Sequence, residues 1–406
     1  MKIYLFIDIF IIYNSYPMEN LIKDILKEIF DNLHLKYQIR LIQTNKFFNS
    51  IPITDFKNIG KRYQEKITDE ILLKYPSIKE LKILKNGVIK KWKNINYLTN
   101  LKILDCRNEW YYENNKIQNK DIKAPNLIKL YTPNSIFNDI SHMSNLRVLD
   151  CSLDSAISDK DIQNLNLIKL NAYDNLKIKN IGHMTNLKIL NCSWKCAITD
   201  DDIKNLDLEE LNACNNPNIK NIDHLTKLKV LNCGGRCGIK EIKNTSLIEL
   251  YVTNNKYFKS NINHLTNLKV LMCSDNIRDD DIHNLDLIEL YMYNNTKIKN
   301  LNNFTNLKIL HCKNYRTDDP IVTDDDIKNL DLIELNVNNN KFIKNINHLT
   351  NLRILECEYN SAISDENIKN LINLEELSVN DNEKIKNINH LTKLKVLKCN
   401  GESKII

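Results

Sequence analysis

Eleven cysteines and nine histidines are the residues of this chain with the most distinctive chemistry. Residues of these types can bind a metal, form disulfides or supply a thiol nucleophile. Eight of the cysteines recur at intervals of about 40 residues, at Cys106, Cys151, Cys192, Cys233, Cys273, Cys312, Cys357 and Cys399. Six of the histidines follow the same interval, at His142, His183, His224, His264, His348 and His390. This regular spacing indicates a repeat rather than one compact site.

The repeat is a Leu-x-x-Leu-x-apolar kernel that returns about every 20 residues from Leu101 onward. Kernels of one kind end in cysteine, as LKILNC does at Leu187, and we refer to them as type A. They alternate with type B kernels, such as LIELYM at Leu287. Eight type A and seven type B kernels are present, and residues 67–83 read as one further, degenerate rung.

This pattern resembles the leucine-rich repeat family, in its cysteine-containing subclass, whose signature is L-x-x-L-x-L-x-x-N/C-x-L. The signature asparagine falls eight residues after the first leucine of six type B kernels, at Asn175, Asn216, Asn255, Asn295, Asn340 and Asn382. The resemblance implies an α/β solenoid, a horseshoe of about 16 short parallel strands with the kernel leucines and cysteines inside. We expect the asparagine amides to bond backbone groups of the next rung.

The stacking of strands separates the members of the cysteine and histidine columns. Successive type A strands would lie two rungs apart, roughly 9.5 Å at about 4.8 Å per strand. Disulfide-linked Cα atoms lie within about 7 Å of each other, and zinc ligands lie about 2.1 Å from the metal. We therefore predict reduced, buried thiols, structural contacts for the histidines, no metal and no cofactor. A zinc site of Cys192, Cys196, Cys233 and Cys237 would require two of them to leave the core.

The segments after the kernels differ between the two types. Ser158, Thr199 and Thr323 each precede an aspartate by three residues, the spacing of a capping box. This pattern predicts short helices on the convex side of type A rungs. Type B rungs carry Ile-x-x-Ile-x-His-Leu-Thr instead, which predicts tight turns.

Residues 18–50 do not fit the repeat and carry apolar side chains at helical spacing. Their pattern, which includes Leu26, Ile29 and Phe30, resembles the F-box, a three-helix motif of cullin-RING ubiquitin ligase receptors. The proline that the motif places after its first leucine is an isoleucine here. The resemblance implies that a Skp-family adaptor contacts Leu21, Ile22, Ile25, Leu33 and Leu35. Alternatively, these helices only cap the open end of the solenoid.

We divide the chain into a leader at 1–17, F-box-like helices at 18–50, a linker with the first-repeat helix at 51–77, and a solenoid at 78–406. The leader could be a secretion signal, but Asp8 interrupts its apolar part and no small-residue cleavage site follows. Alternatively, synthesis starts at Met18. The apolar stretch at 3–13 is shorter than the about 20 residues of a membrane span. We expect a cytoplasmic protein without a membrane partner.

The net charge of +6 is small and its charges are interleaved. The chain has only seven glycines and no phosphate-cradling loop. A nucleic-acid partner is therefore not expected. No H-E-x-x-H, G-x-S-x-G or kinase-type motif is present, so we do not expect an enzyme.

The residues that flank the kernel leucines should face the concave side of the horseshoe. Exposed aromatic side chains are the usual anchors of protein interfaces. We predict that those in the middle and late rungs project from neighbouring strands and bind a protein target. Alternatively, these rings cover adjacent side chains in cross-strand pairs. The predicted target-binding residues are Trp194, Tyr251, Tyr291, Tyr293, His311 and Tyr359.

Together, the two resemblances imply the substrate-recognition subunit of a Skp-cullin-F-box type ubiquitin ligase. The first alternative is a leucine-rich repeat binding module without ligase coupling, and the second is a metal- or nucleic-acid-binding array. The excess of Lys, Asn and Ile is similar to that of F-box proteins carried by giant DNA viruses of amoebae. A viral origin would place the protein in the host cell cytoplasm. The sequence leaves the target and the oligomeric state open.

Overall fold

The computed structural model describes residues 38, 72–73, 77–82, 98–107, 124–134, 139–259, 261–315 and 322–400. The chain divides into two compact units, Met1–Leu146 and Arg147–Ile406. The leader lies outside the described residues. So do Leu21, Ile22, Ile25, Leu33 and Leu35, the predicted adaptor-binding side chains of the segment 18–50.

In the first unit, each described strand follows from one kernel. These strands are β1 (Glu80–Lys82), β2 (Ile103–Asp105) and β3 (Lys129–Tyr131). They pair in parallel and in sequence order, with Leu81 opposite Leu104 and Leu104 opposite Leu130. Strand β1 falls within residues 67–83, which confirms that this degenerate kernel forms a rung.

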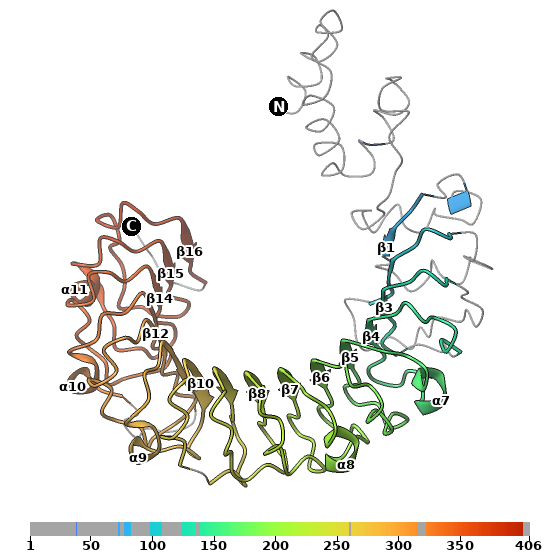
Figure 1. Cartoon of the computed structure of the whole chain (residues 1–406). Coiled ribbons are helices and arrows are strands. Elements are labelled where there is room, and N and C mark those ends of the chain that lie inside the picture. The colour runs from blue at the N-terminus through green and yellow to red at the C-terminus, as the bar shows by residue number, and fades with distance from the viewer. Residues whose placement is uncertain are drawn as a thin grey trace, which may run out of the picture. The chain divides into compact units, whose positions relative to one another are not determined.

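The second unit has one short strand for each kernel, and each strand pairs in parallel with the next one in the chain. In Figure 1 these strands line the inner side of a curve and the short helices lie on its outer side. The strands are β4 (Val148–Asp150), β5 (Lys169–Asn171), β6 (Ile189–Asn191), β7 (Glu210–Asn212), β8 (Val230–Asn232), β9 (Glu249–Tyr251), β10 (Val270–Cys273), β11 (Glu289–Met292), β12 (Ile309–His311), β13 (Glu334–Asn336), β14 (Ile354–Glu356), β15 (Glu376–Ser378) and β16 (Val396–Lys398).

The core is built from the kernel side chains, which stack in register. Leu250, Leu271 and Leu290 oppose one another on β9, β10 and β11, and all three are fully buried. Burying one leucine contributes about 1.5–3 kcal/mol, so the repeated column is the main source of stability. The type A cysteines join this column as predicted, except that Cys399 of the last kernel is exposed.

Five type A rungs carry the predicted convex helices. In the first of them, the Asp161 carboxylate accepts hydrogen bonds from both the backbone N–H and the hydroxyl of Ser158, which confirms the capping box. The rung of β8 has no helix because only two residues separate Ile239 from Ile242, whereas four residues separate Ile198 from Ile203 in the rung that carries a helix after β6. In type B rungs the described residues that follow the strand form turns, bends and irregular backbone without a helix. The helices are α7 (Asp159–Ile162), α8 (Asp200–Ile203), α9 (Asp279–Ile282), α10 (Asp324–Ile327) and α11 (Asp365–Ile368).

The signature asparagines are buried and hold adjacent rungs together. The Asn175 amide donates to the Cys151 carbonyl at 2.7 Å, and its Oδ1 accepts from the Lys177 N–H at 2.8 Å. Cys151 belongs to the preceding rung, so the prediction of bonds to the next rung was wrong in direction. The side-chain oxygen of the asparagine caps the turn that follows its own strand. Its amide nitrogen therefore points back toward the preceding rung.

The described part of the chain contains no helix with the length and hydropathy of a membrane span.

Candidate interaction surface

The concave face of the second unit is formed by the strand residues on either side of each buried leucine, because side chains alternate along a strand. The residue after this leucine forms one continuous column across the sheet. In β5 to β8 this column holds Asn171, Asn191, Asn212 and Asn232, which we name the asparagine segment. In β9 to β12 it holds Tyr251, Met272, Tyr291 and His311, which we name the aromatic segment.

Side chains of the aromatic segment contact one another across strands. Tyr291 lies opposite Met272 on one side and opposite His311 on the other. The Tyr291 and His311 rings meet edge to face, with their centroids 4.7 Å apart. All four side chains are partly exposed, so they form an accessible strip of apolar surface.

Glutamates on the same strand or on the neighbouring strand orient these rings. The hydroxyls of Tyr251 and Tyr291 donate to Glu249 and Glu289, each at 2.7 Å. His311 donates from Nε2 to Glu334 Oε1 at 2.6 Å. Burial, followed by the Glu289 carboxylate, raises the pKa of Tyr291 well above its ordinary value, so this hydroxyl stays protonated at neutral pH.

The structure brings together three of the six predicted target-binding residues and separates the others. Tyr251, Tyr291 and His311 lie in one column on β9, β11 and β12. Trp194, Tyr293 and Tyr359 do not project from strands. They lie in the loops that follow β6, β11 and β14, because each strand ends at or before the kernel's sixth residue.

Trp194 and Tyr359 adopt left-handed backbone conformations, with φ angles of 65° and 57°. This conformation costs roughly 1–2 kcal/mol for a residue with a bulky side chain. The equivalent position of type B rungs holds residues that tolerate it, for example Asn215 and Asp174. In the type A rung that follows the one with Trp194, this position holds Gly235, with φ of 63°. Two aromatic residues therefore occupy a position where the backbone favours glycine or asparagine.

Sequence reasoning missed Met272, which completes the aromatic segment between Tyr251 and Tyr291. It is the fifth residue of the kernel LKVLMC, the position that places Tyr251 and His311 in the same column. The column position was the signal that could have identified it, since a search for aromatic side chains alone passes over methionine.

The histidine and cysteine columns have structural contacts. His183, His224 and His264 each face, through Nε2, a backbone carbonyl of the type A segment before them, at 3.4, 3.0 and 2.9 Å. Cys192, Cys196, Cys233 and Cys237 are all buried with unbridged thiols. Burial raises the pKa of Cys273 and of Cys312 to about 12, which disfavours a reactive thiolate. No cluster of metal-ligating side chains was found among the described residues.

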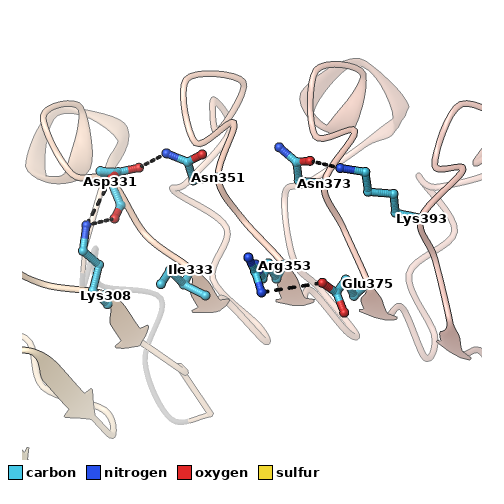
Figure 2. Close-up of a pocket in the computed structure, with 8 residues that line it drawn as sticks. All are labelled: Lys308, Asp331, Ile333, Asn351, Arg353, Asn373, Glu375 and Lys393. Carbon is cyan, nitrogen blue, oxygen red and sulfur yellow. Dashed lines mark hydrogen bonds and ion pairs between the residues drawn. The ribbon is translucent and has the colours of Figure 1, made fainter.

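Beside strands β12 to β15, a pocket of about 300 Å³ is lined by charged and amide side chains that pair with one another. Figure 2 shows Lys308 directed at Asp331, with an Nζ to Oδ2 distance of 3.0 Å. Arg353 lies 3.8 Å from Glu375. Because these charges are already matched, this pocket is a weaker candidate for ligand binding than the aromatic segment.

Comparisons with known proteins give similarity at the level of solved structures only. No protein-family model matches the chain, and no curated protein matches it. An internalin (inlF) from Listeria monocytogenes is 22% identical over 93% of this chain and 97% of that chain, with a TM-score of 0.38. The functional domain of InlJ from Listeria monocytogenes, described as including a cysteine ladder, is 19% identical. That match covers 81% of this chain and 64% of the InlJ chain, also with a TM-score of 0.38.

At this TM-score the superpositions are loose. The assignment of the fold therefore rests on the observed strand pairing, the buried kernel leucines and the asparagine column. These features define a leucine-rich repeat solenoid.

Proposed function

We propose that this chain is a protein-recognition solenoid whose aromatic segment contacts a protein target. The observation that carries the proposal is the continuous column of Tyr251, Met272, Tyr291 and His311 on the concave face. Tyrosine and methionine are enriched in the buried centres of protein interfaces.

The rings of this column are already held in place. The hydrogen bonds from Tyr251 and Tyr291 to their glutamates fix the ring orientations before any partner arrives. Preorganised side chains lose less conformational entropy on binding.

Quantitative affinity capture from a lysate tests the proposal with matched variants. A Tyr251→Ala/Tyr291→Ala/His311→Ala variant removes the aromatic segment. An Asn171→Ala/Asn191→Ala/Asn212→Ala variant changes the same column in the asparagine segment. The aromatic variant should capture at least tenfold less of each protein that the parent chain and the asparagine variant retain, because interface energy concentrates in a few aromatic anchors. Equal loss from both variants, or from neither, would contradict the proposal.

We further propose that the segment at 18–50 couples this receptor to a Skp-family adaptor, which would make it the substrate-recognition subunit of a ubiquitin ligase rather than the catalyst. The F-box-like pattern of the sequence supports this coupling. Purified chain should co-purify with the adaptor, and a Leu21→Asp/Ile22→Asp variant should not, with unchanged circular dichroism of the solenoid. Adaptor binding that survives this double change would refute the docking site. A parent chain that never binds the adaptor would favour a binding module without ligase coupling.

A further inference from the structure

A second surface of the solenoid lies away from the aromatic segment, where the chain leaves strands β5 to β9. Loops from five consecutive rungs line a groove of about 960 Å³ there, which we name the loop groove. Apolar side chains are unusually open in it: the exposed fractions of Leu176, Trp194 and Tyr257 are 65%, 48% and 43%. The neighbouring Pro217 and Ala197 extend this apolar surface.

The remaining lining of the loop groove is strongly basic. It includes no acidic residue among the described ones and holds five exposed cations, Lys179, Lys195, Lys220, Arg236 and Lys240. None of the five has an ion-pair partner in the part of the chain that the structure describes. By contrast, Lys188, Lys269 and Lys308 at the strand edge all pair with aspartates.

Two of these lysines each have a carboxylate from the preceding rung close to their backbone. Asp159 Oδ1 accepts the backbone N–H of Lys179 at 2.8 Å, and Asp200 Oδ1 accepts that of Lys220 at 2.8 Å. These carboxylates contact the lysine backbones and form no ion pair with the ammonium groups. The groove therefore presents side-chain cations that are free to pair with carboxylates of a ligand.

Trp194 keeps its ring at this groove despite its left-handed backbone, whereas Gly235 fills the same position in the next type A rung. The same position is left-handed at Leu153 and Tyr359 of other type A rungs, so what distinguishes Trp194 in this groove is its large, exposed ring. The tryptophan ring also contacts Tyr173 edge to face, with centroids 6.1 Å apart. These observations mark Trp194 as the apolar anchor of the groove.

We propose that the loop groove binds an acidic, extended peptide segment that carries an aromatic or aliphatic anchor residue. Five rungs at about 4.8 Å per strand span roughly 19 Å, which matches about six extended residues at roughly 3.3 Å each. Carboxylates of the peptide would pair with the five cations while its anchor packs on Trp194. This site does not depend on the concave surface.

A single-stranded nucleic acid fits the groove less well. Trp194 and Tyr257 lie three rungs apart, about 14 Å at about 4.8 Å per strand. Consecutive bases stack on aromatic side chains that follow one another along the strand. Between these two rings the lining holds no further aromatic side chain, and its apolar members there include Ala197 and Pro217.

The test uses the full chain and a phage-displayed library of random heptapeptides. Selection should enrich peptides that combine at least two acidic residues with one aromatic or aliphatic residue. A synthetic peptide of the enriched sequence is then measured by fluorescence anisotropy. A Lys179→Glu/Lys220→Glu variant should bind it at least tenfold more weakly, since like charges now face each other. The matched Lys344→Glu/Lys386→Glu variant changes the same repeat position in later rungs and should bind within twofold of the parent chain.

A second variant separates binding from folding. Trp194→Gly should weaken peptide binding at least fivefold while the melting temperature stays equal or rises, because glycine suits this backbone. Three results would overturn the proposal: no acidic enrichment, equal losses in the two lysine variants, or Lys179- and Lys220-dependent binding of oligo(dT) or phosphatidylserine vesicles in place of peptide.

Discussion

The asparagine segment and the aromatic segment occupy the same column of the same sheet, yet they present different surfaces. Their strands share one register, and their leucines, such as Leu211 on β7 and Leu290 on β11, are equally buried. Only the outward residue changes, from amide to ring. The core of this solenoid is thus independent of what its concave face displays, and function is added without altering the scaffold.

The largest expected difference between the two regions is in how the free energy of unfolding depends on pH, because they differ in their buried thiols. The rungs of β6 and β8 carry an additional buried cysteine each, Cys196 and Cys237, which the rungs of β10 and β12 lack. Burial raises the pKa of Cys196 to about 11 and that of Cys237 to about 12. An unfolded thiol titrates near about 8.5. As pH rises above that value, the unfolded chain loses protons first, so the free energy of unfolding falls.

This loss amounts to about 1.4 kcal/mol per pH unit for each buried thiol. A Cys196→Ala/Cys237→Ala variant should therefore lose about 4 kcal/mol less stability than the parent chain between pH 8 and pH 10. Urea denaturation at both pH values measures it. The difference between the two proteins at pH 7 serves as the control for packing, and parallel pH profiles would show that these thiols are not buried in solution.

The shared core gives the next largest effect. Leu211→Ala and Leu290→Ala should each lower the free energy of unfolding by about 3 kcal/mol, because both side chains leave equivalent cavities. The two values, from denaturant unfolding monitored by circular dichroism, should agree within about 0.5 kcal/mol. A clear inequality would mean that the concave surface and the core are coupled after all.

The smallest effect concerns the hydroxyls that orient the aromatic segment. Tyr251→Phe and Tyr291→Phe each remove one hydrogen bond to a glutamate on a half-exposed surface. We expect a loss of about 0.5–1 kcal/mol for each, with the rings retained. An Asn212→Ala variant gives the comparison for the asparagine segment, where it removes the hydrogen bond from the Cys214 N–H to Asn212 Oδ1. Tyrosine variants as stable as the parent chain would show that the rings are not held in place.

Periodic features of the molecule were predictable from the sequence, because the same residue types recur at the same position of successive rungs. The strands, the buried cysteines, the capping box at Ser158 and the histidine contacts with backbone all follow from one aligned column each. The left-handed turn that carries Trp194 and Tyr359 was not predictable, because it lies beyond the kernel and residues such as Gly235 and Asn215, which favour it, are also common in ordinary turns. The loop groove was hidden for another reason: its lining comes from five rungs and forms no motif.

The asparagine and histidine contacts also bear on how such a chain can change length. Asn216 reaches the Cys192 carbonyl, and His224 reaches the Ile203 carbonyl, so a type B rung is joined by side chains to the type A rung before it. The unit that can be duplicated is consequently a pair of rungs, one of type A followed by one of type B. Duplicating or deleting such a pair would reproduce every contact at the new junction. Gain or loss of a single rung would instead place two rungs of the same type next to each other and leave a buried asparagine amide without its partner. Tandem duplication in steps of two is therefore the growth rule that this architecture permits.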